Sequence, residues 1–345
     1  MGAERVQARG PGRVNLIGEH TDYNGGLALP FAIARGVTVT AEPLSGDRIE
    51  ADALDVGERD AFSLAAPERV PGWRAFVRGT VAELSAAGHA LRPCRLTIEG
   101  DVERGSGLSS SAALEAALSL ALLAVAGEPE PDDRRELARL CSRVENDWVG
   151  AETGLLDQLA SLCGQPGRAI RIDFRSLAID PVPLELGGWT LVTLDSGAEH
   201  SHAGSGYNER RRECDEAAER LGIASLSDAD AAAVDSLPEP LAARARHVLT
   251  ENARVEAMVR ALGAGDLEEA GRLLDASHAS LRDDYAASVP AVERTVERLK
   301  DAGAAGARMV GGGFGGHVLA LLSPGATTPD GALEVAPSAG ARLLS

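Results

Sequence analysis

Apolar positions recur along the chain with two different spacings, which predict a mixture of strands and helices. Alternating or short apolar runs predict a strand and turn at 37–50 and strands at 95–102, 169–174 and 189–196. Helical spacing predicts helices within 103–127, 132–150 and 207–221, and a longer helical region at 239–302 that is broken at 263–266 and near Pro290. Residues 307–322 predict a strand, a glycine turn and then a second strand or a helix.

The length of 345 residues indicates two domains or one large domain. A proline-containing stretch joins the strands predicted at 169–174 and 189–196 and places a boundary near 170–185. We therefore divide the chain into domains at 1–175 and 176–345. The hydrophobic pattern by itself indicates only a mixed α and β protein with two lobes.

Composition narrows the functional classes. The 34 basic and 52 acidic residues give a net charge of −18, which argues against a surface for nucleic acid or for an anionic membrane. The longest apolar run, 116–126, is too short to span a bilayer. The four cysteines form no CxxC pair, and the first ten residues have no apolar core. We expect a cytoplasmic protein without zinc or disulfides.

A single lysine, Lys300, restricts the possible phosphate chemistry. The GxxxxGK[ST] phosphate loop and the nucleotide-binding strand of protein kinases each require a lysine within their own motif. Lys300 lies in neither kind of motif, so both are excluded. The glycine–serine stretch GSGLSSSAAL at 105–114, which leads into an Ala/Leu helix, offers another means of binding phosphate. The free N–H groups and the dipole at a helix start favour an anion. The alternative is a serine N-cap after a flexible turn.

The opening stretch GPGRVNLIGEHTDYNGG at 10–26 combines glycines with charged and hydroxyl side chains. VNLI within it predicts a buried strand that fixes the loop after it. Glu19 and Asp22 could be solvated loop acids, and His20 could make a structural hydrogen bond. A sugar site is the alternative, because carboxylates and an imidazole suit the many hydroxyls of a sugar.

Three stretches carry a family resemblance. GLSSSAAL at 107–114 resembles the phosphate loop of the GHMP small-molecule kinases. The stretch at 12–26 resembles the galactokinase signature, and GARMVGGGFGGHVLAL at 306–321 resembles the third GHMP motif. Further similar segments are LLDQL at 155–159, GSGYNERRREC at 204–214, VLTENARV at 248–255 and SHASLRDDY at 277–285. The resemblance covers residues 9–322 in the family's order.

The resemblance implies a two-lobed α+β GHMP kinase fold. A mixed-sheet N-terminal domain and a ferredoxin-like C-terminal domain would flank the active site. The implied reaction is phosphorylation of the anomeric hydroxyl of α-D-galactose by ATP and Mg²⁺, giving galactose 1-phosphate, the first step of galactose catabolism. The implied partners are galactose and ATP, with no nucleic acid or membrane, for a monomer or weak homo-oligomer.

The resemblance also implies site residues. Asp157 would be the general base and Arg13 its cationic neighbour. The sugar would contact Glu19, His20, Thr21, Asp22, Gly154 and Tyr207. The nucleotide would contact Gly105, Ser106, Gly107, Leu108, Ser109, Ser110, Ser111 and Trp73. The metal ligands would be Ser111 and Glu145.

Each of these roles has a structural alternative. Arg13 could be a surface arginine, and Glu145 could be an exposed helix acid. Asp157 could cap a helix that begins at Gln158, which is compatible with catalysis. Trp73 could belong to the core. The glycines at 311–316 are expected to pack near the phosphate loop or to form a purely structural turn, and His317 is given no role.

Two other functions remain open. The first is a sister kinase that acts on arabinose or N-acetylgalactosamine. The second is a non-catalytic galactose sensor on the same fold, against which the intact serines 109–111 argue. The segment 323–331 is too short for a further helix that the family has there. Residues 332–343 resemble the family's closing strand, so the segment 332–345 could pack on the N-terminal domain.

Overall fold

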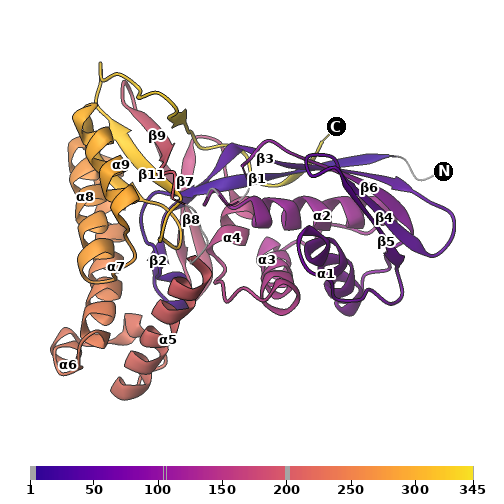
Figure 1. The fold of residues 1–345 in the computed structure, drawn as a ribbon, viewed down its shortest axis with the longest axis horizontal. Helices are drawn as coiled ribbons and strands as arrows, with labels where there is room; N and C mark the ends of the chain where they lie inside the picture. The colour runs from indigo at the N-terminus through magenta and orange to yellow at the C-terminus, as the bar shows by residue number, and fades with distance from the viewer. Residues whose placement is uncertain (1–4, 104, 106, 199–202, 345) are drawn as a thin grey trace.

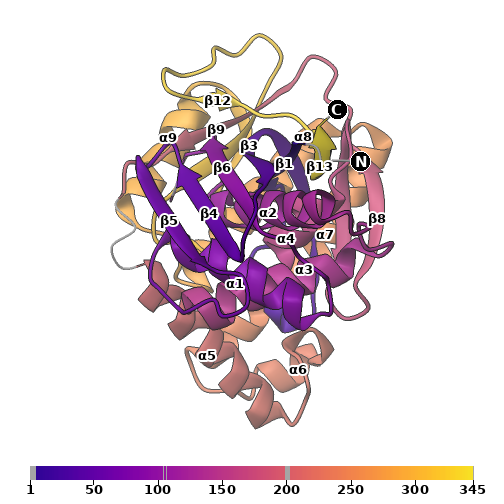
Figure 2. The same ribbon diagram turned by 90° about the vertical axis from the view of Figure 1, so that its right-hand side faces the viewer.

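The computed structural model describes residues 5–103, 105, 107–198 and 203–344. A long sheet with helices on one face makes up one half of the molecule, and a smaller sheet with long helices makes up the other (Figures 1 and 2). The long sheet has, in order, β13 (Arg342–Leu344), β1 (Val6–Asn15), β3 (Pro30–Pro43), β6 (Cys94–Gly100), β4 (Arg48–Ala53) and β5 (Glu58–Ser63). All neighbours are antiparallel except β4 and β6.

Four helices cover one face of the long sheet, as Figure 1 shows. They are α1 (Trp73–Ala86), α2 (Ser110–Ala126), α3 (Arg134–Arg143) and α4 (Leu156–Cys163). Helix α2 contacts β1 and β3 on one side and the other three helices on the other. It is apolar nearly all round because it is enclosed on both sides. The start of this central helix is therefore fixed firmly against β1.

The second half contains a sheet with the order β10 (Ala304–Met309), β11 (His317–Leu322), β9 (Thr190–Asp195) and β12 (Leu333–Glu334). Helices α8 (Leu267–Asp283) and α9 (Pro290–Asp301) pack on β10 and β11, and α7 (Leu241–Ala264) packs on α8. Helices α5 (Ala203–Leu221) and α6 (Ala231–Val234) contact α7. A third sheet has the order β2 (Leu27–Ala28), β7 (Arg168–Asp173) and β8 (Ala178–Pro183).

The two halves are also connected at the C-terminal end of the chain. β12 pairs with β9 in one sheet, and β13 pairs with β1 in the other. Residues 323–332, which precede β12, contain no helix. The boundary predicted between residues 175 and 176 falls in the turn of the β7–β8 hairpin. Its position stays a prediction.

Most predicted elements are present, with four differences. The strand and turn predicted at 37–50 are present as the end of β3 and the residues after it, but the last three residues, 48–50, already belong to β4. β1 ends at Asn15, so the last two residues of VNLI are buried but lie beyond the strand. The helix predicted at 132–150 changes after Arg143 into a π-helical turn, Val144–Val149. Helix α4 begins at Leu156 and has no side-chain cap, so the prediction that Asp157 caps a helix starting at Gln158 is wrong.

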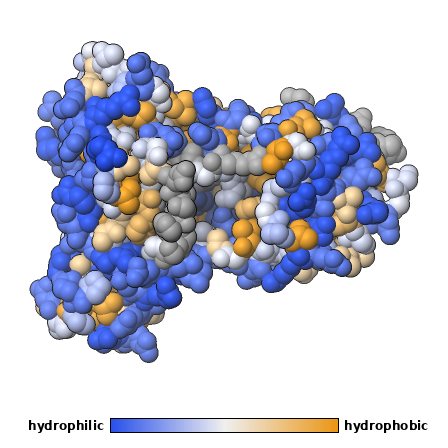
Figure 3. All heavy atoms as spheres, in the orientation of Figure 1, coloured by the Kyte–Doolittle hydropathy of each residue, from blue (hydrophilic) through white to orange (hydrophobic). Residues whose placement is uncertain are grey.

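Polar residues dominate the face of the molecule drawn in Figure 3, which is indented between the two halves. Among the residues that the structure describes, no helix is long and apolar enough to cross a membrane.

Candidate active site

A cavity of about 440 Å³ lies where β1, α4, α5 and the turn between β10 and β11 meet. Its walls come from four separate parts of the chain. The lining residues are Arg13, Glu19, His20, Asp22, Val149, Gly150, Ala151, Glu152, Thr153, Gly154, Leu156, Asp157, Tyr207, Asn208, Gly311, Gly312 and Gly313. The structure thus brings together seven of the residues predicted to act in catalysis or sugar binding.

Arg13 and Asp157 form an ion pair at one end of the cavity. Both Nε and Nη2 of Arg13 approach Oδ1 of Asp157, at 2.7 and 2.6 Å, and Nη1 donates to the carbonyl of Gly107 at 2.5 Å. The Arg13 side chain is only 6% exposed, whereas the Asp157 carboxylate is 30% exposed. Arg13 is therefore not a surface arginine. It holds Asp157 at the edge of the cavity in an ionic, hydrogen-bonded pair.

The serine loop joins this pair at the start of α2. Ser109 donates its hydroxyl to Oδ2 of Asp157, although its position was predicted to bind phosphate. Ser109 has a left-handed backbone (φ 60°) and makes no side-chain cap to α2. The alternative of a serine N-cap is therefore wrong for Ser109. The Ser109 hydroxyl binds Asp157 and not the backbone at the start of α2. The partial positive charge of the helix start therefore remains available to an anion.

The glycines shape the phosphate loop and its neighbour. Gly105 and Gly107 have φ values of 71° and 81°, which other residues rarely adopt. A Cβ on Gly311 would lie 3.7 Å from the carbonyl oxygen of Gly107, so the glycine turn packs close to this loop as predicted. Leu108 is buried, and its carbonyl accepts the N–H of Arg13 at 3.1 Å. Ser106 lies outside the described residues.

The acids of the opening stretch also line the cavity. Glu19 is 4% exposed, and its Oε1 accepts the N–H of Gly311 at 2.8 Å. Glu19 is therefore an anchored carboxylate and not a solvated loop acid. Asp22 is half-buried, and burial together with the nearby charge of Asp157 raises its pKa to about 6. A Cβ on Gly154 would lie 2.0 Å from Oδ2 of Asp22, so only glycine fits there.

His20 is enclosed by aromatic rings. Its Nδ1 lies 2.8 Å from the hydroxyl of Tyr23, which lies 2.7 Å from the hydroxyl of Tyr285. The ring of Tyr207 is 5.4 Å from the His20 ring. All three tyrosines of the chain thus gather around this histidine. Burial lowers the pKa of His20 to about 3, so the ring is neutral at ordinary pH.

Thr21 differs from its predicted role. The side chain is fully buried, and its hydroxyl donates to the carbonyls of Gly18 and Leu27 at 3.0 and 2.7 Å. It is not among the residues that line the cavity. Thr21 closes the loop internally, because its only hydroxyl proton is shared between two backbone acceptors. Direct contact of Thr21 with a ligand in the cavity is therefore not supported.

Glu145 is buried in the π-helical turn, so the alternative of an exposed helix acid is wrong. Its Oε2 accepts hydrogen bonds from Thr153 Oγ1 at 2.9 Å and from Gln158 Nε2 at 2.7 Å. Ser111 also hydrogen-bonds to this carboxylate. Burial and the charge of Asp157 raise the pKa of Glu145. Thr153 and Gln158 were missed by the sequence analysis, although Gln158 lies in the quoted segment LLDQL.

Trp73 begins α1, at a distance along the chain from every lining segment. Its Nε1 donates to Glu58 Oε2 at 2.9 Å, and the guanidinium of Arg74 lies 5.4 Å from the ring centre. The ring packs partly against the main apolar core. These contacts agree with the core alternative, and a contact of Trp73 with nucleotide stays a prediction.

Replacing Asp22 by Asn is expected to stabilise the unliganded protein at pH 7–8 but not near pH 4. The folded-state pKa of about 6 lies above the ordinary value of 3.8. Ionised Asp22 therefore costs folding free energy, and this cost builds up as the pH rises from about 4 to about 6 and is complete above that. At about 1.4 kcal/mol per pKa unit, the gain has an upper bound of about 3 kcal/mol. Urea unfolding at both pH values measures it, and an equal gain at both would contradict the assignment.

Three regions of the chain match models of known protein families. Residues 1–43 match the family model of the galactokinase galactose-binding signature. Residues 75–165 match the N-terminal domain of GHMP kinases, and residues 258–336 match the GHMP kinase C-terminal model. The cavity is lined by residues of all three regions and by Tyr207 and Asn208 from the segment between the second and the third.

Individual galactokinases are also similar to this chain over most of its length. A galactokinase of Mycobacterium tuberculosis is 48% identical over 90% of this chain and 87% of its own length. A galactokinase of Roseiflexus is 43% identical over 92% of this chain and 83% of its own.

The solved structures show the same relationship. The Lactococcus lactis galactokinase complexed with galactose superposes with a TM-score of 0.90 and 33% identity, over 99% of this chain and 95% of that one. The Methanococcus jannaschii mevalonate kinase, at 17% identity, shares the fold with a TM-score of 0.66, over 93% of this chain and 91% of that one. The chain therefore belongs to the galactokinase family and has the two-domain α+β fold of the GHMP kinases.

Proposed function

We propose that this protein transfers the γ-phosphoryl group of ATP to the anomeric hydroxyl of α-D-galactose. The observation that carries the proposal is the cluster of Arg13, Asp157 and Ser109, which joins the start of α2 to the cavity and its charged side chains. A phosphoryl donor at the helix start and a sugar in the cavity would meet at Asp157. Phosphoryl transfer depends mainly on such positioning and on charge stabilisation.

The cavity suits a hexose. Glu19 and Asp22 offer carboxylate acceptors for sugar hydroxyls, and neutral His20 offers a ring nitrogen. Tyr207 forms one wall. The structurally similar Lactococcus lactis protein was solved with galactose, which supports galactose as the ligand. Acceptors fixed in position can discriminate strongly between epimers, because a misplaced hydroxyl leaves buried polar groups unpaired.

Asp157 is the proposed general base. Its Oδ1 is bound by Arg13 and its Oδ2 by Ser109, and the carboxylate still reaches the cavity. It would take the proton of the anomeric hydroxyl as that oxygen attacks the γ-phosphorus. The adjacent guanidinium of Arg13 would stabilise the negative charge that spreads over the transferring phosphoryl group.

The helix start is the proposed site for the phosphates of ATP. The chain has no lysine in this region, so backbone N–H groups of residues 107–111 and the dipole of α2 would supply the positive potential. Gly105 and Gly107 allow the backbone to approach a phosphate without a side chain in between.

The donor set fits Mg²⁺ as a companion of ATP. Mg²⁺ favours oxygen ligands and often takes only one or two from the protein, with water and phosphate supplying the rest. Ser111 and Glu145 form such a pair of oxygen donors beside α2. No group of three or more potential His, Cys, Asp or Glu ligands occurs among the described residues. The bound ion would neutralise phosphate charge, while Thr153 and Gln158 orient Glu145.

Replacing Glu145 by Gln is expected to raise the Mg²⁺ concentration for half-maximal activity about tenfold or more, because the proposed carboxylate ligand of the ion is lost. The KM for galactose should change little. The measurement is a Mg²⁺ titration of ADP release at saturating galactose and ATP. Glu136→Gln on the exposed face of α3 is the matched control. An unchanged Mg²⁺ dependence would remove Glu145 from the metal site.

The function itself is tested by ADP release with a panel of free sugars. Galactose is expected to give the highest kcat/KM, above arabinose, N-acetylgalactosamine and glucose. A higher value with one of the other sugars would assign the chain a different substrate. Galactose binding without any ADP release would instead indicate a sensor.

A further inference from the structure

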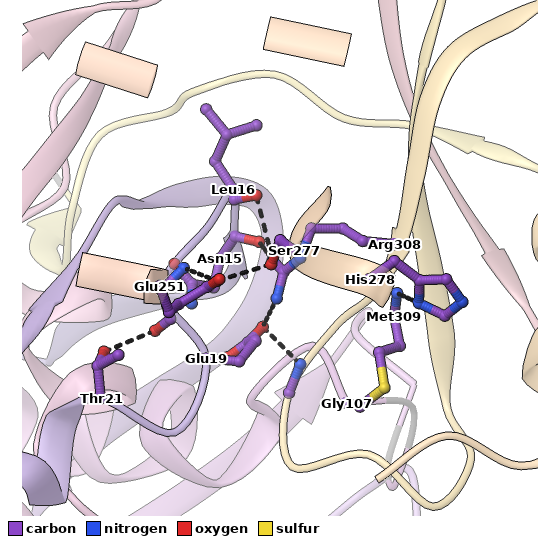
Figure 4. A network of polar contacts seen from close by, with 12 residues as sticks. Asn15, Leu16, Glu19, Thr21, Gly107, Glu251, Ser277, His278, Arg308 and Met309 are labelled. Atoms are coloured by element: carbon purple, nitrogen blue, oxygen red, sulfur yellow. Dashed lines mark hydrogen bonds and ion pairs between the residues drawn. The ribbon is translucent and has the colours of Figure 1, made fainter. Parts of the chain in front are cut away.

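Arg308 lies at the junction of the two halves and has no part in the proposed chemistry. It is on β10, and its side chain is completely buried. Figure 4 shows it directed from β10 toward the end of β1 and the loop that follows. A buried guanidinium is costly unless it is paired and hydrogen-bonded. Its partners therefore indicate what it does.

Those partners all belong to the opening stretch. Nη1 donates to the carbonyls of Asn15 and Leu16 at 2.9 and 3.1 Å, where β1 gives way to the loop. Nη2 lies 3.3 Å from Oε1 of Glu19. The same Oε1 receives the N–H of Gly311 at 2.8 Å. The guanidinium charge of Arg308 and the backbone N–H of Gly311 thus converge on one carboxylate oxygen.

A second buried group supports the loop from α7. Oε1 of Glu251 accepts the N–H of Gly18 at 2.9 Å and the hydroxyl of Ser277 at 2.6 Å. The backbone before Glu19 is therefore held on both sides, by Arg308 and by Glu251. Of these two side chains, only Arg308 also contacts the Glu19 carboxylate, and Arg308 does not line the cavity.

We propose that Arg308 is a positioning residue for sugar recognition, which sets galactose affinity by fixing the Glu19 carboxylate and the start of its loop. The inference rests on the proposed function, since Glu19 is taken as a sugar ligand. Arginine suits the task because its planar fork reaches two carbonyls and a carboxylate at once. The single ammonium group of lysine cannot reproduce that arrangement.

The test compares Arg308→Met and Arg308→Lys with the wild-type protein in steady-state kinetics. Truncating one partner of a buried charge pair is costly, so the KM for galactose should rise about tenfold or more in the Met variant. The rise should be smaller in the Lys variant, and the KM for ATP should stay within about twofold in both, since the hydrogen bonds and the ion pair of Arg308 within the described residues go to the end of β1 and its loop. A structural role would not separate the two substrates.

Arg78→Lys is the matched control. Arg78 is also largely buried, and it forms two hydrogen bonds to the carboxylate of Asp60 on β5, the edge strand of the long sheet. The Arg78→Lys substitution should lower the unfolding midpoint without changing either KM. Equal changes in the two KM values of the Arg308 variants, or no change in the galactose KM, would overturn the proposal. Failure of both Arg308 variants to fold would assign Arg308 to stability alone and would also overturn it.

A second measurement does not depend on galactose being the substrate. Arg308→Met leaves the Glu19 carboxylate buried without its cation, so adding Glu19→Gln should raise the urea midpoint above that of Arg308→Met alone. If Glu19→Gln only destabilises further, the coupling is absent and the proposal fails. If the coupling is present but wild-type protein binds no galactose, the proposed function fails instead, and the positioning role applies to another ligand.

Discussion

The Asp157→Asn variant is expected to lose about 10²–10⁴-fold in kcat while galactose still binds. Asn keeps the size of Asp157 and an oxygen acceptor for Ser109, but it cannot take a proton. It also leaves Arg13 without its counter-charge beside the cavity. Because neither substrate is expected to be held mainly by Asp157, the defect should appear in turnover and not in sugar affinity.

Coupled detection of ADP release measures the turnover, and titration calorimetry measures galactose binding by the same protein. Asp132→Asn, in the exposed turn before α3, is the matched control and should be indistinguishable from wild type. Turnover at the wild-type rate in Asp157→Asn would remove the residue from the catalytic role. Loss of galactose binding together with turnover would show that Asp157 holds the sugar.

Arg13→Lys is the second large effect, with an expected fall in kcat of about 10²-fold at nearly constant KM for galactose. Lysine keeps the positive charge but cannot bond Asp157 and the carbonyl of Gly107 at the same time. The carboxylate and the phosphate loop would therefore lose their common anchor. The effect is expected to fall on the transition state, because that is where phosphoryl charge must be stabilised.

The same kinetic assays measure it, with Arg9→Lys as control. Arg9 lies on the same strand, four residues earlier, and pairs with Asp101 at the surface. Its replacement should leave kcat unchanged. A kcat within about twofold of wild type for Arg13→Lys would show that positive charge alone is sufficient, and that the fork geometry has no catalytic importance.

The motifs predicted much of the site, because their chemistry is local. The serine stretch leads directly into α2, and Gly127 ends that helix with a left-handed backbone, as its position in the pattern predicts. The order of motifs also predicted the family, which the family models and the relatives confirm. The sugar, catalytic and metal roles of individual residues stay predictions that the geometry supports.

Side-chain direction was less predictable. Ser109 could have faced a phosphate or capped α2, and only its left-handed backbone directs it to Asp157. Thr21 sits between Glu19 and Asp22 in sequence but faces inward, since neighbouring loop residues point in different directions. Tyr23 and Tyr285 are 262 positions apart, so no local pattern could show that both surround His20.

Most local elements, the lack of a lysine-based phosphate loop and the membership of a kinase family could be predicted from the sequence, because each depends on residue types at short spacing. Which side chains meet depends on the folded chain. Arg13 and Asp157 are separated by 144 positions, and Arg308 and the carbonyl of Asn15 by 293. Contacts over such distances arise only when α4 packs on β1 and the Arg308 side chain of β10 reaches the end of that strand. The burial that results gives Asp22, His20 and Glu145 the pKa values that no isolated segment would have.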